Sequence, residues 1–146
     1  MHQRFLKPIL STLRDRGFTI EVETNGTLAP EAEIVQCVDS FNVSPKTSNS
    51  LVPGTVRTRP GALRALSKTN KAWFKFVVCS PTDLAEVEGM VSKFELPRDR
   101  VFLMPEGADV VTLAERTRWV VEACKSHQFR FSPRMHILVY GNKRGT

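Results

Sequence analysis

The chain has 146 residues, a length that predicts one compact domain covering residues 1–146. Hydrophobic residues make up 41% and charged residues 25%, which is typical of a soluble globular protein. The sequence has no apolar run long enough to span a bilayer and no signal-peptide layout, so we expect a cytoplasmic protein without a membrane partner. The net charge of +6 comes from scattered basic residues, with local density only at Arg57, Arg59 and the tail Lys143–Arg144. Nucleic-acid binding is therefore disfavoured as the main function.

Helices and strands alternate in the first half of the chain. Apolar residues at helical spacing precede Gly17, a natural helix stop, and the next segment alternates apolar and polar residues as a half-buried strand does. The predicted elements are a helix within Gln3–Arg16, a strand at Phe18–Glu23, a short helix at Pro30–Gln36 and a strand at Phe41–Val43.

The alternation continues to the end of the chain. Ser80 suits a helix N-cap, Pro81 the first helical position and Asp83 the capping-box position. The predicted elements are a helix at Arg59–Lys68, a strand at Trp73–Val78, a helix from Pro81, a strand at Val101–Met104, a helix at Val110–Ser126 and a last strand at Met135–Tyr140. This order predicts an α/β fold with a mostly parallel sheet covered by helices. The loop Thr47–Pro60 is either a lid or a surface excursion.

Polar residues follow four of the predicted strands. They are Glu23-Thr24-Asn25, Ser44-Pro45-Lys46, Cys79-Ser80 and Met104-Pro105-Glu106. In parallel α/β folds, ligands bind at the carboxyl ends of the strands, because the strand-to-helix loops open on that side. We therefore predict a polar site at which Glu23, Asn25, Lys46 and Glu106 converge.

Each of these residues also has an ordinary structural interpretation. Asn25-Gly26 can simply supply a positive φ in a turn, and Lys46 can be a solvated surface lysine. Met104-Pro105 can end a strand, and Glu106 can cap the next helix. Their shared placement at strand ends favours the site.

Several motifs, in this order, carry a resemblance to a known family. They are ETNGT, VSPK, FKFVV, LMPEG and FSPRMHILVYGNKRG, and they extend over nearly the whole chain. Together they resemble the 7-carboxy-7-deazaguanine synthases, radical S-adenosylmethionine lyases of queuosine and 7-deazapurine biosynthesis.

The resemblance implies a modified (β/α)6 barrel and a radical ring contraction. The implied reaction converts 6-carboxy-5,6,7,8-tetrahydropterin to 7-carboxy-7-deazaguanine with loss of ammonia. The implied cofactors are S-adenosylmethionine, a 4Fe-4S cluster and Mg²⁺, and the implied partner is the small-molecule pterin.

The resemblance also assigns residues by position. The residues matching segments that contact S-adenosylmethionine are Ser44, Pro45, Lys46, Leu103, Met104, Pro105, Glu106, Glu23, Thr24 and Asn25. His136 matches a histidine on the substrate side of the pocket, and it is equally a histidine satisfied on the last strand. No catalytic residue and no metal ligand is assigned to this chain.

The sequence departs from the family pattern in its cluster ligands. The family's CxxxCxxC and GGEP segments are absent, as is the threonine that usually serves Mg²⁺. Cys37, Cys79 and Cys124 lie too far apart to replace three closely spaced thiolates, so we expect reduced, mostly buried thiols and no stoichiometric 4Fe-4S cluster. The expectation is a truncated, C-terminal two-thirds of the barrel, lacking its first two strands and inactive alone.

Three functional interpretations follow. The first is a 7-carboxy-7-deazaguanine synthase or a subunit of a split enzyme, which would act as a homodimer or with a separate N-terminal polypeptide. The second is a non-catalytic remnant that binds a nucleoside or pterin. The third is a basic protein whose Lys143–Arg144 tail contacts RNA.

Overall fold

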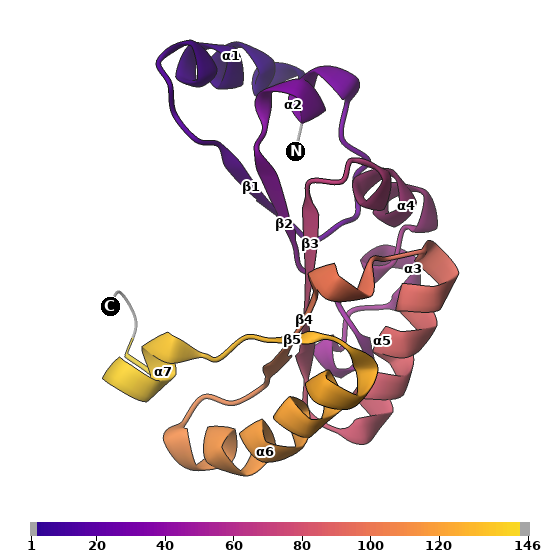
Figure 1. Ribbon diagram of the computed structural model, residues 1–146, viewed down its shortest axis with the longest axis vertical. Helices are drawn as coiled ribbons and strands as arrows, with labels where there is room; N and C mark the ends of the chain where they lie inside the picture. The colour runs from indigo at the N-terminus through magenta and orange to yellow at the C-terminus, as the bar shows by residue number, and fades with distance from the viewer. Residues whose placement is uncertain (1–2, 144–146) are drawn as a thin grey trace.

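The computed structural model describes residues 3–143, and the fold is built around one parallel sheet. The strands are β1 (Glu21–Thr24), β2 (Ser40–Val43), β3 (Ala72–Val78), β4 (Val101–Pro105) and β5 (Arg130–Phe131), and their spatial order is β1-β2-β3-β4-β5. Each neighbouring pair is parallel. The predicted α/β class is confirmed, and the curved sheet is consistent with part of a (β/α) barrel (Figure 1).

Helices connect the strands. The α-helices are α1 (Lys7–Asp15), α2 (Ala32–Cys37), α3 (Gly54–Arg57), α4 (Pro60–Lys68), α5 (Pro81–Phe94), α6 (Val110–His127) and α7 (Met135–Tyr140). Single 3₁₀ turns lie at Gln3–Phe5, Ser48–Ser50 and Arg98–Arg100. Within the described residues, the structure contains no helix with the length and apolarity needed to cross a membrane.

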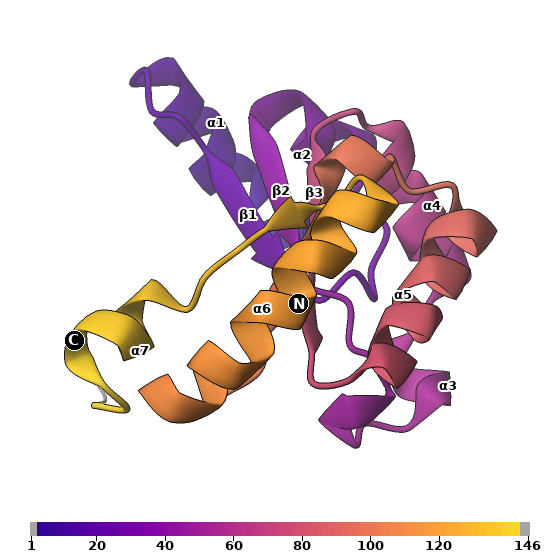
Figure 2. The same ribbon diagram turned by 60° about the horizontal axis from the view of Figure 1, so that its bottom comes forward.

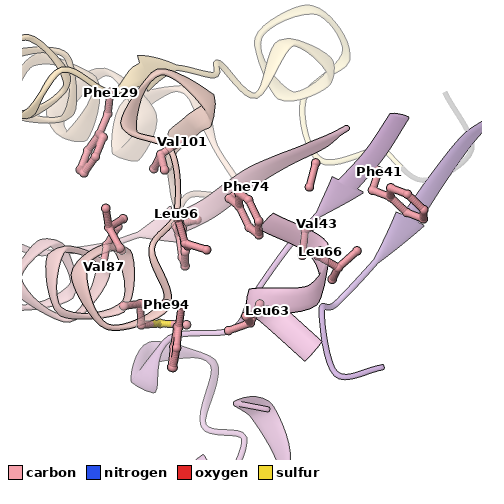
Figure 3. Packing of buried hydrophobic residues seen from close by; sticks show 14 of the residues in the cluster. Phe41, Val43, Leu63, Leu66, Phe74, Val87, Phe94, Leu96, Val101 and Phe129 are labelled. Carbon is pink, nitrogen blue, oxygen red and sulfur yellow. The ribbon is translucent and has the colours of Figure 1, made fainter. Parts of the chain in front are cut away.

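Within residues 3–143, the hydrophobic core lies against one face of the sheet. Residues of β2, β3 and β4 alternate between buried and half-buried, and the buried set joins one core with side chains from α1, α2, α4, α5 and α6. Figure 3 shows part of this core, with Phe41, Val43 and Phe74 from the strands and Leu63 and Leu66 from α4. Figures 1 and 2 show α4 and α5 covering one side of the sheet, while α7 extends on the other side.

The opposite face is more polar and open. The half-buried or exposed side chains of β1 to β4 that alternation places there include Glu23, Asn42, Trp73, Lys75 and Phe102. The strand register sets these residues beside one another, because Glu23 is opposite Asn42, Asn42 opposite Trp73, and Lys75 opposite Phe102. In a barrel, this face would line the interior.

The beginning of α5 follows the predicted capping pattern. Ser80 is the N-cap, Pro81 is the first helical residue, and the Asp83 carboxylate accepts hydrogen bonds from the backbone N–H groups of Cys79 (2.7 Å) and Ser80 (3.0 Å). Asp83 is 5% exposed, so these bonds satisfy a nearly buried carboxylate at a helix N-terminus. This cap fixes the point at which the chain leaves β3.

The prediction of a last strand at Met135–Tyr140 is wrong, because these residues form the helix α7. The last strand is instead β5, which pairs with β4 at Phe102 and Leu103, and the Ser132 N–H extends the pairing to the Leu103 carbonyl at 2.9 Å. Pro133 then follows and cannot donate a ladder hydrogen bond. A short apolar run does not by itself distinguish a strand from a helix turn. In this fold, the position beside β4 is already occupied by β5.

Two further expectations are adjusted by the structure. The first strand begins at Glu21 rather than Phe18, whose side chain is exposed. All three cysteines are free thiols, of which Cys124 is buried and the other two are half-buried. Of the predicted basic tail, Arg144 lies outside the described residues.

We expect the stability of the fold to depend on pH through Glu88 on α5. Hydrogen bonds from Arg98 hold the pKa of Glu88 below its usual range, and burial opposes this shift while His127 supports it. A lowered folded-state pKa adds stability that is fully present above the unfolded-state value near 4.5 and is lost as pH falls through the folded-state pKa.

Urea unfolding of wild type and Glu88→Gln at pH 7 and pH 4 measures this contribution. The variant should be less stable by about 1 kcal/mol at pH 7, and the two proteins should converge as the pH falls. Glu33→Gln is the control, because its ion pair with Lys7 joins side chains that are 53% and 50% exposed and should contribute little. An equal loss at both pH values would contradict the assignment.

Candidate functional site

A cavity of about 390 Å³ opens at the carboxyl ends of β2, β3 and β4. Its volume is within the range of small-molecule sites. The residues that line it come from these strands and from the loop after β2, and they are Ser44, Pro45, Lys46, Thr47, Asn49, Ser50, Lys75, Val77, Cys79 and Glu106. The strand-end rule therefore located the cavity correctly, and it brings Lys46 and Glu106 together.

The loop after β2 forms one wall of this cavity. Thr47 is only 2% exposed, and its hydroxyl donates to the Asn49 side-chain carbonyl at 2.9 Å. The Asn49 side-chain amide donates to the Val77 carbonyl at 2.9 Å, which joins the loop to the end of β3. The first turn of the loop is thus bonded to the sheet, and the interpretation of Thr47–Pro60 as a lid or as a surface excursion stays a prediction.

The carboxylate of Glu106 is held in place by Arg116 of α6. Arg116 donates to the Glu106 carboxylate and, at 2.7 Å, to the Glu106 backbone carbonyl. Glu106 does not cap α6, since the N-cap is Asp109, whose carboxylate accepts from the Thr112 N–H at 2.8 Å. Glu106 is therefore available to the cavity as an ion-paired carboxylate.

The ETNGT segment builds a turn beside the cavity. The Asn25 side-chain carbonyl accepts from the Thr27 N–H at 3.1 Å and from the Thr27 hydroxyl at 2.7 Å, and the Thr24 hydroxyl accepts from the Gly26 N–H at 3.2 Å. Gly26 has a φ of +76°, as the turn interpretation of Asn25-Gly26 requires. Asn25 lines neither of the two polar cavities on this side, and its part in a site with Lys46 stays a prediction.

Glu23 lies at a second, neighbouring cavity on the open face of the sheet. This cavity has a volume of about 220 Å³ and is lined by Glu23, Asn42, Trp73, Lys75, Phe102 and Ser132. Lys75 borders both cavities, which makes them parts of one polar region. This region contains the Lys75 ammonium and the Glu23 carboxylate, together with the rings of Trp73 and Phe102, whose centroids are 5.8 Å apart.

The remaining predicted residues lie in different environments. Leu103 and Pro105 are buried on the packed side of β4, whereas Met104 is half-buried on the open side. Pro105 ends its strand, as the structural interpretation of Met104-Pro105 expected. His136 is exposed on α7, so the interpretation that places it on a strand does not hold. Contacts of these residues with a cofactor or substrate stay predictions.

Sequence reasoning missed Lys75, Asn49 and Arg116. Lys75 had a detectable signal, because it is a charged residue in the middle of an otherwise apolar parallel strand, where both faces are usually hydrophobic. Asn49 and Arg116 had none, since each acts through a partner that is distant in the sequence.

The three cysteines do not fit an iron–sulfur cluster. They lie at the end of α2, after β3 and in α6, and residues 3–143 contain no group of three His, Cys, Asp or Glu side chains that could hold a metal ion. Burial raises the pKa of the Cys79 thiol, and the negative charges of Asp83 and Glu106 add to this effect. Cluster ligation requires several thiolates at one point, whereas Cys79 lies apart from the other two cysteines and has a raised pKa.

Comparisons with known proteins agree with the motif resemblance. No family model matches the chain. Its sequence is 39% identical over 143 residues to a 7-carboxy-7-deazaguanine synthase of Pyrobaculum aerophilum, a match that covers 98% of this chain and 61% of that protein. It is 33% identical over 138 residues to a protein of the same name from Hyperthermus butylicus, covering 92% and 58% of the two chains. A third, from Rhodopirellula baltica, is 29% identical over 150 residues, covering 94% and 57%.

These matches extend over almost the whole chain and over all the strands of the sheet. The chain spans about three fifths of the length of these relatives, with coverage of 61%, 58% and 57%. The resemblance indicated by the motifs is thereby confirmed: over almost its whole length, the chain is similar in sequence to proteins named 7-carboxy-7-deazaguanine synthase.

Proposed function

We propose that the chain acts in 7-carboxy-7-deazaguanine synthesis by binding S-adenosylmethionine in the cavity at the ends of β2, β3 and β4. The observation that carries this proposal is the convergence of Lys46 and Glu106, which belong to two separate motifs, around one cavity of about 390 Å³. Relatives that carry the name of a synthase support the pathway. The reaction on 6-carboxy-5,6,7,8-tetrahydropterin belongs to this proposal.

The residues of the cavity suit a charged nucleoside. Lys46 and Lys75 offer ammonium groups for a carboxylate, and the Glu106 carboxylate offers an acceptor for an amine or for ribose hydroxyls. Ser44 and Ser50 add hydroxyl groups at the rim. These residues bind and orient, and none of them supplies redox chemistry.

The second candidate function is binding without radical chemistry. It is favoured by the separation of the three cysteines, which do not fit the cluster that the family's reaction requires. Both candidate functions use the same cavity, but only the first includes formation of 7-carboxy-7-deazaguanine. Formation of 7-carboxy-7-deazaguanine from the pterin by this chain alone, under anaerobic reconstitution with iron and sulfide, would exclude the second candidate.

Binding of S-adenosylmethionine to the purified chain, measured by titration calorimetry, tests the shared step. We expect weak binding, with a dissociation constant of about 0.1–1 mM, because the three cysteines do not fit a cluster whose iron would hold the amine and carboxylate of the methionine. Lys46→Ala should weaken binding about threefold to tenfold, since one exposed ammonium contributes modestly.

Lys125→Ala is the matched control, because Lys125 is an exposed lysine of α6 that does not line the cavity. Its ion-pair partner, Glu122, is one turn away on the same helix. It should leave the affinity unchanged. Absence of detectable binding at millimolar ligand would refute the proposal, as would an equal effect of the two lysine variants.

A further inference from the structure

Glu86 of α5 contacts the loop after β2 at two points. Its Oε2 atom accepts hydrogen bonds from the backbone N–H and the hydroxyl of Ser48, at 2.8 and 2.6 Å. Its Oε1 atom accepts from the Arg57 guanidinium at 2.8 Å. Arg57 also donates to the Val52 carbonyl at 3.0 Å, so this guanidinium joins α5 to the middle of the same loop.

The contact between Glu86 and Ser48 lies within the part of the loop that forms the cavity wall. Ser48 stands between Thr47 and Asn49, both of which line the cavity, and the next lining residue, Ser50, donates its hydroxyl to the Thr47 carbonyl at 2.7 Å. The Ser48 side of the turn is thus bonded to α5, while the Asn49 side is bonded to β3. The position of the wall depends on both attachments.

The Glu86 carboxylate is suited to this task by charge and position. Burial would raise its pKa, but the hydrogen bonds from Ser48 and Arg57 outweigh burial and lower the pKa of Glu86 below its usual range. Both partners of the ion pair are mostly buried, with side chains 26% exposed for Glu86 and 18% for Arg57. The adjacent residue, Val87, is fully buried in the core, so α5 is packed against the core at the point from which the Glu86 side chain extends.

We propose that Glu86 is a positioning residue that, together with Arg57 and Ser48, fixes the loop wall in the shape that binds the ligand of the strand-end cavity. This inference rests on the proposed function for the identity of the ligand. It assigns a role to a residue that does not line the cavity itself. The energetic link passes from α5 through Ser48 to Thr47 and Asn49.

The loop is tested first without any ligand, by limited trypsin digestion of the whole chain. The bond between Lys46 and Thr47 lies at the edge of the wall, and Thr47 is buried. Glu86→Gln should increase the rate of cleavage at this bond about tenfold, because local opening limits proteolysis of a folded loop. Glu122→Gln, which removes an exposed carboxylate of α6, should leave the rate unchanged. An unchanged rate in Glu86→Gln would overturn the proposal.

Binding of S-adenosylmethionine is measured next on the same proteins. Glu86→Gln and Arg57→Gln should each weaken it about fivefold to tenfold, and the double variant should be no weaker than the worse single variant, because the two side chains act as one unit. Arg57→Lys, which keeps the charge, should restore most of the affinity lost in Arg57→Gln. Additive losses, or no difference between Arg57→Lys and Arg57→Gln, would contradict a positioning role.

The two measurements separate the two hypotheses. If wild type does not bind S-adenosylmethionine but Glu86→Gln still increases cleavage at Lys46, the proposed ligand is wrong and the positioning of the wall stands. Thermal unfolding of each variant checks that the fold is retained. If Glu86→Gln unfolds, Ser48→Ala replaces it, since this change removes only the hydroxyl contact with Glu86, and unchanged cleavage in that variant would likewise overturn the proposal.

Discussion

Replacing Phe74 with alanine is expected to lower the free energy of unfolding by about 3–5 kcal/mol, the usual cost of truncating a buried phenylalanine. Phe74 is 0% exposed and lies on the packed face of the central strand β3. Its ring joins the core that strands and helices share (Figure 3). The loss combines the transfer free energy of the ring with the cost of the cavity that remains.

The matched control for Phe74 is Phe102, the same residue type on the opposite face of the sheet. Phe102 is half-buried on the open side, where it contacts the ring of Trp73. Phe102→Ala should cost only about 1 kcal/mol, because much of its surface is already in contact with water. Urea unfolding of both variants measures the difference, and similar losses would mean that the open face is packed as tightly as the core.

Replacing Gly26 with alanine should lower the free energy of unfolding by about 2–4 kcal/mol. A Cβ atom at this position would lie 2.7 Å from Cδ2 of Leu63 and 2.9 Å from Cγ1 of Val43. Both side chains are almost completely buried, with 1% and 0% exposure, so they cannot move aside freely. The φ of +76° adds backbone strain to this overlap.

Two other glycines separate the contributions to this effect. Gly17 has a nearly equal φ of +78°, but nothing lies within 4 Å of its added Cβ, so Gly17→Ala reports the backbone strain alone, about 1 kcal/mol. Gly89 lies within α5 with free space around it, and Gly89→Ala should stabilise the protein by about 0.5–1 kcal/mol. Equal losses in Gly26→Ala and Gly17→Ala, measured by chemical unfolding, would show that the core accommodates the methyl group.

The parts of the fold that depend on local chemistry could be predicted from the sequence. The capping pattern at Ser80 and Asp83 predicted the start of α5, because its hydrogen bonds join residues three or four positions apart. The apolar strand ending at Val78 was equally clear. The prediction for Met135–Tyr140 was wrong, because its apolar run fits either a strand or a helix. The position beside β4 is taken by β5, and this pairing depends on tertiary contacts that a local pattern does not show.

Of the candidate site, only the location of the cavity could be predicted from the sequence. The rule that ligands bind at strand ends brought Lys46 and Glu106 to one cavity. The bonds that shape this cavity join residues far apart in the chain, such as Ser48 with Glu86 at a separation of 38 positions and Asn49 with Val77 at 28. A single sequence contains no local pattern that pairs such residues.

The one-sided packing of the sheet has a consequence for how the protein tolerates mutation. Phe74 and Phe76 alternate along β3 with Trp73, Lys75 and Val77, so neighbouring positions of one strand serve opposite faces. A change at Lys75 alters the charge of both polar cavities while leaving the core untouched. Substitutions on the open face can therefore change the charge and shape of the polar cavities at little cost in stability, whereas substitutions at the buried positions between them are limited by core packing.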